Sequence, residues 1–365
     1  MRTRLLRIER YVLTNTLFAV AATTAIIGAI VLLINFVELS RNFGGRTDAS
    51  FLEVASLTLL KTPLVILTLL PFVFLFGTLA AFISLNRRSE LIAMRAAGVS
   101  AGRFILPAAI SAAVLGIAAV TVLNPVAAAS EAAFERLRGQ INPDAAEPRR
   151  VWLRQGDGRT QVIIGAASTS PAQGVRLNGV SMFIFLLDQD DQPVFARRIE
   201  AEHARLLPGY WLLTRAREAT PGRAALRYET LSIPSTLDVK SALEKFASPQ
   251  SISFWSLPGA IRRISEAGFS TTTYRLRLHQ LLATPLLFAA MAFLAAVFSL
   301  KLMRLGGLFR LAGVGVAVGF LFFFFDQLCG SLGKAGILPP FVAAWVPPLL
   351  ALLSGFTVLF YTEDG

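Results

Sequence analysis

Six apolar stretches, each about 20 residues or longer, constrain the fold of this chain more than any other feature. A helix of about 20 apolar residues crosses the ~30 Å hydrocarbon layer of a bilayer, so each stretch predicts a membrane-spanning helix. The six stretches are Val12–Phe36, Val54–Leu85, Phe104–Leu123, Leu281–Leu300, Leu308–Gly330 and Ile337–Tyr361. The sequence therefore predicts an α-helical membrane protein with six transmembrane helices.

The composition agrees with this prediction and narrows the chemistry. Of 365 residues, 54% are hydrophobic and 16% are charged, whereas soluble domains average about 25% charged residues. The formal net charge of +12 indicates cytoplasmic loops and headgroup contacts rather than nucleic-acid binding. One cysteine, Cys329, excludes an internal disulfide, and only two histidines, His203 and His279, are present for a metal site or triad. Composition therefore disfavours most hydrolase chemistry and favours a transport or scaffold role.

Two of the six stretches allow more than one interpretation. The second is overlong and contains Lys61, Pro63 and Pro71, but no polar loop divides it, which favours one tilted or kinked helix over two helices. The first follows a basic start, as a signal peptide does. Its apolar run exceeds the 7–15 residues of a signal h-region, so we expect an uncleaved first span.

A strand-rich insert separates the third and fourth spans. Its basic and acidic side chains are dense and nearly balanced, and turn residues separate short β-branched and aromatic runs. The predicted strands are Val151–Gln155, Thr160–Ala166, Val175–Asp188, Pro193–Leu207, Tyr210–Arg217 and Ala225–Ile233. Successive strands without helices between them predict an all-β sandwich or jelly roll. A short amphipathic helix at Ser256–Ala267 then leads back to the membrane.

This pattern predicts three parts: spans one to three in residues 1–126, a β domain in 127–273, and spans four to six in 274–365. With the N-terminus inside, the short inner segments carry eleven basic residues and the short outer segments carry six. The inner ones are Arg2, Arg4, Arg7, Arg10, Arg87, Arg88, Arg95, Arg103, Lys301, Arg304 and Arg310; the outer ones are Arg41, Arg46, Lys61, Arg275, Arg277 and Lys334. The bias predicts cytoplasmic termini and an extracytoplasmic β domain.

One predicted cytoplasmic segment, residues 86–100, has the pattern of a short capped helix near 89–97. Ser89 is a suitable N-cap, Glu90 suits the positive helix N-terminus, and Gly98 suits a left-handed stop. Leu91, Ile92 and Met94 offer it an apolar surface. Two interpretations remain open: a helix lying among the headgroups, or a coupling helix that docks into a groove of a cytoplasmic partner.

Several motifs, in order along the whole chain, resemble the lipopolysaccharide-export permeases of the LptF/LptG type. The segment from Ser89 to Ser100 (Ser-Glu-Leu-x-x-Met-Arg-Ala-Ala-Gly-Val-Ser) follows a span ending Leu-Leu-Pro-x-x-x-x-x-Gly at Gly77. Further matches are Arg10-Tyr11, Asn35-Phe36-Val37-Glu38, Phe325-Asp326-Gln327-Leu328, Leu338-Pro339-Pro340 and Trp345-Val346-Pro347-Pro348. Val37-Glu38 and Asp326-Gln327 favour the LptG branch.

The resemblance implies a permease subunit in the bacterial inner membrane that extracts lipopolysaccharide from the outer leaflet. Its implied partners are a homologous LptF-type permease, a cytoplasmic LptB-type ATPase dimer that binds ATP and Mg, and periplasmic jelly-roll bridge proteins of the LptC and LptA type. No cofactor is expected in this chain, since Gly330–Ala335 lacks the spacer and final Ser/Thr of a P-loop. The implied ATPase-coupling residues are Ser89, Glu90, Leu91, Met94 and Arg95.

Charged residues near the predicted outer face form a second candidate site. Glu38 and Arg41 end the first span and Lys61 lies early in the second; Asp326 is about 27 Å along the fifth from Leu308. Arg41 and Lys61 are candidates to bind lipid phosphate, with Phe325 beside the acyl chains. Ordinary snorkelling of these side chains is the alternative. Leu64 stands at a position that is basic in some members of the family, and Asn35 replaces another. These departures argue against a fixed phosphate clamp, for which Lys61, one turn earlier, is the candidate substitute.

Three other functions are alternatives to lipopolysaccharide export. A membrane-anchored sensor needs an output domain, for which we expect no room after Tyr361. An ion- or proton-coupled transporter needs acidic or histidine residues at mid-membrane, which the spans lack. A mechanotransmitting or other lipid or lipoprotein ABC permease is nearer, but such permeases usually carry the large external domain after the first span.

Overall fold

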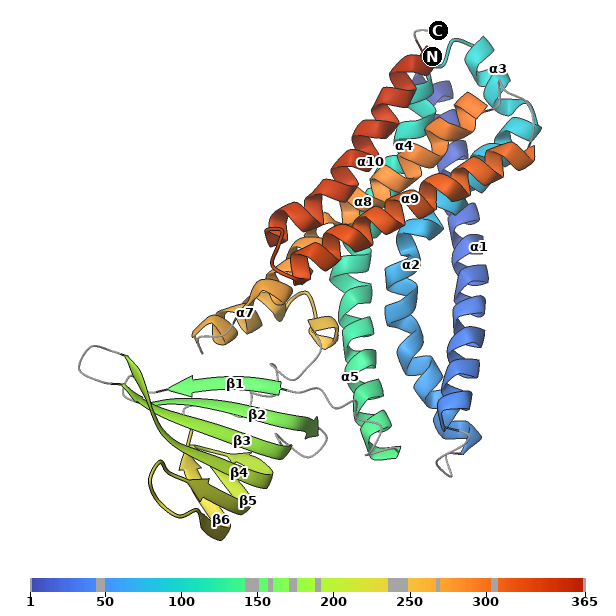
Figure 1. The fold of residues 1–365 in the computed structure, drawn as a ribbon. Helices are drawn as coiled ribbons and strands as arrows, with labels where there is room; N and C mark the ends of the chain where they lie inside the picture. Colours follow the sequence, from blue (N-terminus) through green and yellow to red (C-terminus); the bar gives the residue numbers. More distant parts are fainter. Residues whose placement is uncertain are drawn as a thin grey trace.

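The computed structural model describes residues 2–43, 50–141, 151–156, 160–170, 176–187, 192–235, 249–266, 270–302 and 308–363. Within these ranges, six helices are long and apolar enough to cross a membrane. An antiparallel β-sheet is inserted between the third and fourth of them (Figure 1). The predicted fold class is therefore confirmed, and the chain is a multi-pass membrane protein.

The six spans agree with the six apolar stretches. They are α1 (Arg2–Phe43), α2 (Phe51–Arg87), α4 (Ala101–Ala118) with its continuation, α8 (Thr272–Leu302), α9 (Leu308–Lys334) and α10 (Pro340–Glu363). The third continues through a π-helical turn, η1 (Ala119–Leu123), into α5 (Asn124–Ile141). The overlong stretch is one helix with both prolines inside it, as expected. A capping box starts it, in which Ser50 Oγ accepts from the Glu53 amide and Glu53 accepts from the Ser50 amide.

Three spans are far longer than a bilayer requires: α1, α2 and the third span, which runs from α4 to the end of α5. The 42 residues of α1 span about 63 Å, roughly twice the ~30 Å hydrocarbon layer. In Figure 1, the beginning of α1, the end of α10 and the short helix α3 (Glu90–Ala96) lie at one end of the bundle. α1, α2 and α5 extend furthest toward the opposite end, where the sheet lies. An apolar cluster that includes Leu39, Leu57 and Phe134 joins their ends there, so they form one packed extension.

Small residues let the spans approach closely in the bundle core. A Cβ added to Gly116 on α4 would lie 2.6 Å from Pro285 Cα on α8. A Cβ added to Gly77 on α2 would lie 2.8 Å from Val20 Cα on α1. Backbone contacts this close need glycine, because neither neighbour can rotate away. The two contacts fix the first span against the second, and the third span against the fourth.

The strand-rich insert contains all six predicted strands. They are β1 (Val151–Gly156), β2 (Thr160–Ser170), β3 (Arg176–Leu187), β4 (Pro193–Leu207), β5 (Tyr210–Ala219) and β6 (Leu226–Pro234). Each pairs antiparallel with the next, in the order β1-β2-β3-β4-β5-β6. Burial alternates along β4 and β5, so one face of the sheet carries the domain's apolar core and the other is wet. Trp211 is the largest fully buried side chain in it.

The sheet curls until its first and last strands approach at one end. The buried Gln155 on β1 donates from Nε2 to Pro234 O at the end of β6, 3.2 Å away. Its Oε1 accepts from Trp211 Nε1 and from Ser235 Oγ. One amide thus joins β1, β5 and β6 without any strand pairing between β1 and β6. This curling encloses the apolar face within a single sheet.

The segment that leads from the sheet back to the membrane is hydrogen-bonded to the third span. α7 (Leu257–Glu266) is the amphipathic helix that the sequence predicts, and a short turn, η3 (Pro249–Ser251), precedes it. The Phe254 amide donates to Asn124 Oδ1 at 2.8 Å, and Trp255 Nε1 donates to Thr121 O at 3.1 Å. A π-helical turn leaves backbone carbonyls without their usual helical partners, and Thr121 lies in that turn. Within the predicted range 127–273, the strands occupy 151–234 between helical segments.

We predict that Gly116→Val destabilises the bundle, because the added side chain meets Pro285 backbone and the Phe288 ring. Overpacking of this kind costs about 1–3 kcal/mol. The melting temperature of the purified protein in detergent should fall by several degrees. Gly313→Val on α9 is the matched control, since nothing lies within 4 Å of a Cβ added there. Equal melting temperatures for the two variants would contradict the packing argument.

Candidate functional site

The residues singled out from the sequence lie in three places. The α3 group lies at the end of the bundle where α10 finishes (Figure 1). Glu38 and Lys61 form an ion pair between α1 and α2. Asp326 lines a polar cavity formed mainly by α8, with residues of α2, α9 and α10. The structure does not bring Asp326 to the ion pair, because neither Glu38 nor Lys61 lines that cavity.

α3 ends as predicted and begins differently. Gly98 has φ +80°, its amide donates to Arg95 O, and the Val99 amide donates to Met94 O. This is a Schellman motif, and it confirms the left-handed stop. Ser89 is wrong as a side-chain cap: it adopts φ 59° itself and its hydroxyl makes no capping hydrogen bond. The sharp exit from α2 places Ser89 in a left-handed turn, whereas a side-chain cap needs an extended backbone.

The side chains of α3 divide into anchored and presented groups. Leu91 is 1% exposed and packs into the bundle core with Phe82 and Phe104, so it does not belong to the outward surface predicted from the sequence. Ile92 is 59% exposed on the other side of the helix. Met94 and Arg95 are half-buried. Leu91 therefore fixes the helix to the bundle, and Ile92 presents apolar surface to the outside.

Glu90 is the polar feature of this short helix. Its side chain is half-buried, and Oε2 is buried without a hydrogen-bond partner among the described residues. Buried acceptors are nearly always paired in folded proteins, and leaving one unpaired costs about 1–3 kcal/mol. Glu90 Oε2 is thus a hydrogen-bond acceptor that has no donor among the described residues, and it lies next in sequence but one to the exposed Ile92.

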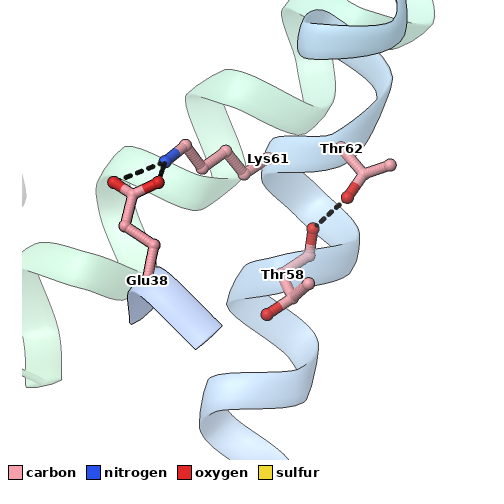
Figure 2. A network of polar contacts seen from close by, with 4 residues as sticks. All are labelled: Glu38, Thr58, Lys61 and Thr62. Carbon is pink, nitrogen blue, oxygen red and sulfur yellow. Dashed lines mark hydrogen bonds and ion pairs between the residues drawn. The ribbon is translucent and has the colours of Figure 1, made fainter. Parts of the chain in front are cut away.

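The second group is centred on Lys61. Its Nζ lies 3.0 Å from both carboxylate oxygens of Glu38, so the ammonium is shared between them (Figure 2). The Lys61 side chain is 24% exposed and that of Glu38 is 51% exposed. Exposed pairs of this kind contribute about 0–1 kcal/mol to stability, because water competes for both charges. An anion that competes with Glu38 can therefore displace it from Lys61 at little cost in free energy.

The threonine hydroxyls near Lys61 on α2 already donate hydrogen bonds within that helix. Figure 2 shows Thr62 Oγ1 turned onto the Thr58 carbonyl, at 2.7 Å. Thr58 Oγ1 in turn donates to Val54 O, so both hydroxyls are used within α2. Arg41 is exposed in the last turn of α1, and no described carboxylate lies within ion-pair distance of it. The site therefore combines one neutralised cation with one that no described acid neutralises.

Asp326 lies in a different environment from the one predicted. It lines a cavity of about 230 Å³ together with Arg277, Lys334, Gln280 and Gln327. Thr68 and Pro71 of α2 complete one wall. Arg277 Nε is buried and has no hydrogen-bond partner in the part of the chain that the structure describes. The cavity is thus a polar chamber that places acidic and basic side chains within a largely apolar bundle.

Arg277 is the residue that the sequence reasoning missed, because it was counted as a cation of an outer loop. The signal was present in its spacing. Arg277, Gln280, Leu281 and Thr284 recur at i, i+3, i+4 and i+7, which places them on one face of a helix. Phe325 is half-buried and lines none of the described cavities.

Comparison with known proteins places this architecture in a family. The family model described as "Lipopolysaccharide export system permease LptF/LptG" matches residues 10–361. A protein of Escherichia coli K12 named lipopolysaccharide export system permease protein LptG is 22% identical over 351 residues, covering 93% of this chain and 94% of that protein. Its namesake from Haemophilus influenzae is 24% identical over 380 residues, covering 98% and 99%. The resemblance read from the motifs is confirmed: the chain belongs to the lipopolysaccharide-export permease family LptF/LptG.

Proposed function

We propose that this chain is a permease subunit that extracts lipopolysaccharide from the outer leaflet of the bacterial inner membrane. The observation that carries the proposal is the family match over residues 10–361, which includes both the spans and the inserted sheet. The energy comes from ATP bound and hydrolysed by a cytoplasmic ATPase dimer. A second, homologous permease completes the cavity that receives the lipid. The family name supports such a system, and the subunit arrangement is our inference.

The contact with the ATPase is assigned to α3. Leu91 anchors the helix in the bundle core, so force applied to α3 reaches the spans directly. Ile92 enters an apolar part of the ATPase groove, and Glu90 Oε2 accepts a hydrogen bond from a donor there. Met94 and Arg95, both half-buried, border this contact, and Ser89 sets its entry angle. α3 then lies in the cytoplasm, and the β domain lies in the periplasm.

The headgroup site is assigned to Arg41 and Lys61. A lipid phosphate meets Arg41 first, since no described acid neutralises it. It then competes with Glu38 for Lys61, and the weak, half-exposed pair yields. Glu38 thus makes phosphate binding reversible, because its carboxylate pairs with Lys61 again once the phosphate has left. Asp326 and Phe325 act deeper in the bundle, on the path of the lipid.

The last step is a transfer to the β domain. The curled sheet has an apolar inner face, formed from β2 to β6, that suits acyl chains. From there the lipid passes to periplasmic bridge proteins of similar fold.

We predict that Glu90→Arg abolishes co-purification with the cytoplasmic ATPase, or its coupled activity, because it replaces an acceptor with a bulky cation. The measurement is the amount of ATPase retained on the tagged permease. Glu229→Arg is the matched control, since it makes the same change at an exposed position on β6, far from α3. Wild-type retention and coupling in Glu90→Arg would refute the docking role.

We predict opposite effects for the two members of the ion pair. Lys61→Ala should weaken lipopolysaccharide retention by about tenfold, the worth of a charge-assisted contact. Glu38→Ala should raise retention, up to about fivefold, because it removes the carboxylate that pairs directly with the ammonium, in a pair worth at most about 1 kcal/mol. The double variant should behave as Lys61→Ala. Retention is measured as lipid bound per purified complex; a loss in Glu38→Ala would contradict the competition between Glu38 and phosphate.

We also predict that photoreactive residues at Arg41, Lys61 and Phe325 become cross-linked to lipopolysaccharide in cells. Phe341 on α10 is the control, because it is an exposed aromatic residue in the first turn of the neighbouring span. Labelling at the three positions that does not exceed that at Phe341 would remove them from the lipid path.

A further inference from the structure

A further cavity lies at none of the three places described above. It is a groove of about 910 Å³ between α1 and α4, and it takes no part in the proposed extraction path. α1 contributes Glu9, Arg10, Leu13 and Leu17, which recur at helical spacing on one face. α4 contributes Arg103 and the face that continues from it to Leu115. The volume lies within the range of small-molecule sites.

The groove is polar at one end and apolar along the rest of its length. Glu9, Arg10 and Arg103 lie at the end of the bundle that carries α3. Beyond them the walls are aliphatic. The exposed members are Leu17, Leu106, Ile110, Val114 and Leu115. Ser111 is the polar exception, and its hydroxyl donates to the Ala108 carbonyl of its own helix.

The depth of the groove fits one leaflet. From Arg103 to Leu115 is twelve residues of helix, or about 18 Å. Half of the hydrocarbon layer is about 15 Å thick. A molecule that enters with its polar group at the arginines therefore has its apolar part alongside the groove until the middle of the bilayer.

The charges at the polar end select the headgroup. No described side chain forms an ion pair with Glu9, Arg10 or Arg103, so all three charges remain to be matched from outside. Two guanidinium groups suit a phosphate, which accepts paired N–H donors. One carboxylate beside them suits a primary ammonium. A free anion, or a lipid with phosphate alone, leaves Glu9 as a repulsive neighbour.

We propose that this groove binds one glycerophospholipid of the leaflet next to α3, with a zwitterionic headgroup of phosphate and primary amine. Arg10 and Arg103 hold the phosphate, Glu9 holds the ammonium, and one acyl chain lies between α1 and α4. The lipid fills space that the two helices leave open, and it thereby couples the position of α1 to that of the third span. This assignment does not depend on lipopolysaccharide or on an ATPase.

The test is retention of lipid by the intact chain, reconstituted in nanodiscs of phosphatidylethanolamine and phosphatidylglycerol in equal amounts with the same acyl chains. After extraction, native mass spectrometry counts the lipids that remain bound. We expect one phosphatidylethanolamine, held about tenfold more strongly than phosphatidylglycerol. Arg103→Gln should reduce retention of both lipids by about tenfold, and Glu9→Gln should abolish the preference between them. Arg88→Gln, an exposed arginine that does not line the groove, should change neither.

A second variant tests the apolar part independently. Ile110→Trp fills the groove from α4, and it should displace the lipid while the protein stays monodisperse. A photoreactive residue at Leu106 should label phosphatidylethanolamine, and one at the exposed Leu353 of α10 should label it far less. Equal retention of the two lipids by the wild type would overturn the headgroup assignment. Retention unchanged by both Arg103→Gln and Ile110→Trp, or a partner protein cross-linked at Leu106 in place of lipid, would overturn the site.

Discussion

The hydrocarbon layer is the constraint on which this structure depends. Backbone polar groups within it must be satisfied inside the chain, and a helix does so for every residue of a span. The layer needs only about 20 residues per helix, yet α1 continues for 42. With α2 and α5 it extends furthest toward the end of the molecule where the sheet lies (Figure 1). The apolar cluster around Leu57 and Phe134 holds the three extensions together.

The long helices separate two sites that lie at opposite ends of the molecule. At one end the chain offers a seven-residue helix, α3, whose anchor Leu91 lies in the bundle core. At the other end it offers exchangeable charges and a curled sheet. The third span runs between the two ends. It is held by the contact of Gly116 with Pro285 and by the hydrogen bonds from Phe254 and Trp255 at and just after its π-helical turn. We infer that motion imposed at α3 reaches the sheet along this helix.

Much of the fold could be predicted from the sequence, because its signals are local. Apolar length predicted the six spans, β-branched and aromatic runs separated by turn residues predicted all six strands, and Gly98 predicted the end of α3. The family resemblance followed from the order of short motifs.

The features that were missed depend on how distant segments meet. Ser89 has the right side chain for a cap, but the turn out of α2 gives it a left-handed backbone. Leu91 and Ile92 are equally apolar, and only the packing against Phe82 decides which one is buried. Gln155 joins strands that are 80 residues apart in the chain, as in its bond with Ser235, and no local pattern indicates it. Arg277 was read as a loop cation, although tertiary packing places it in a polar chamber with Asp326.

We infer that this chain moves lipid without hydrolysing nucleotide, and that the driving motion passes from the α3 end toward the sheet. The most direct measurement places a photoreactive residue at Tyr228, which packs against the apolar core of the sheet, in proteoliposomes that contain the assembled transporter. Lipopolysaccharide should label this position only when ATP is supplied on the side of α3. Labelling that does not depend on ATP, or ATP hydrolysis by the purified chain alone, would contradict this inference.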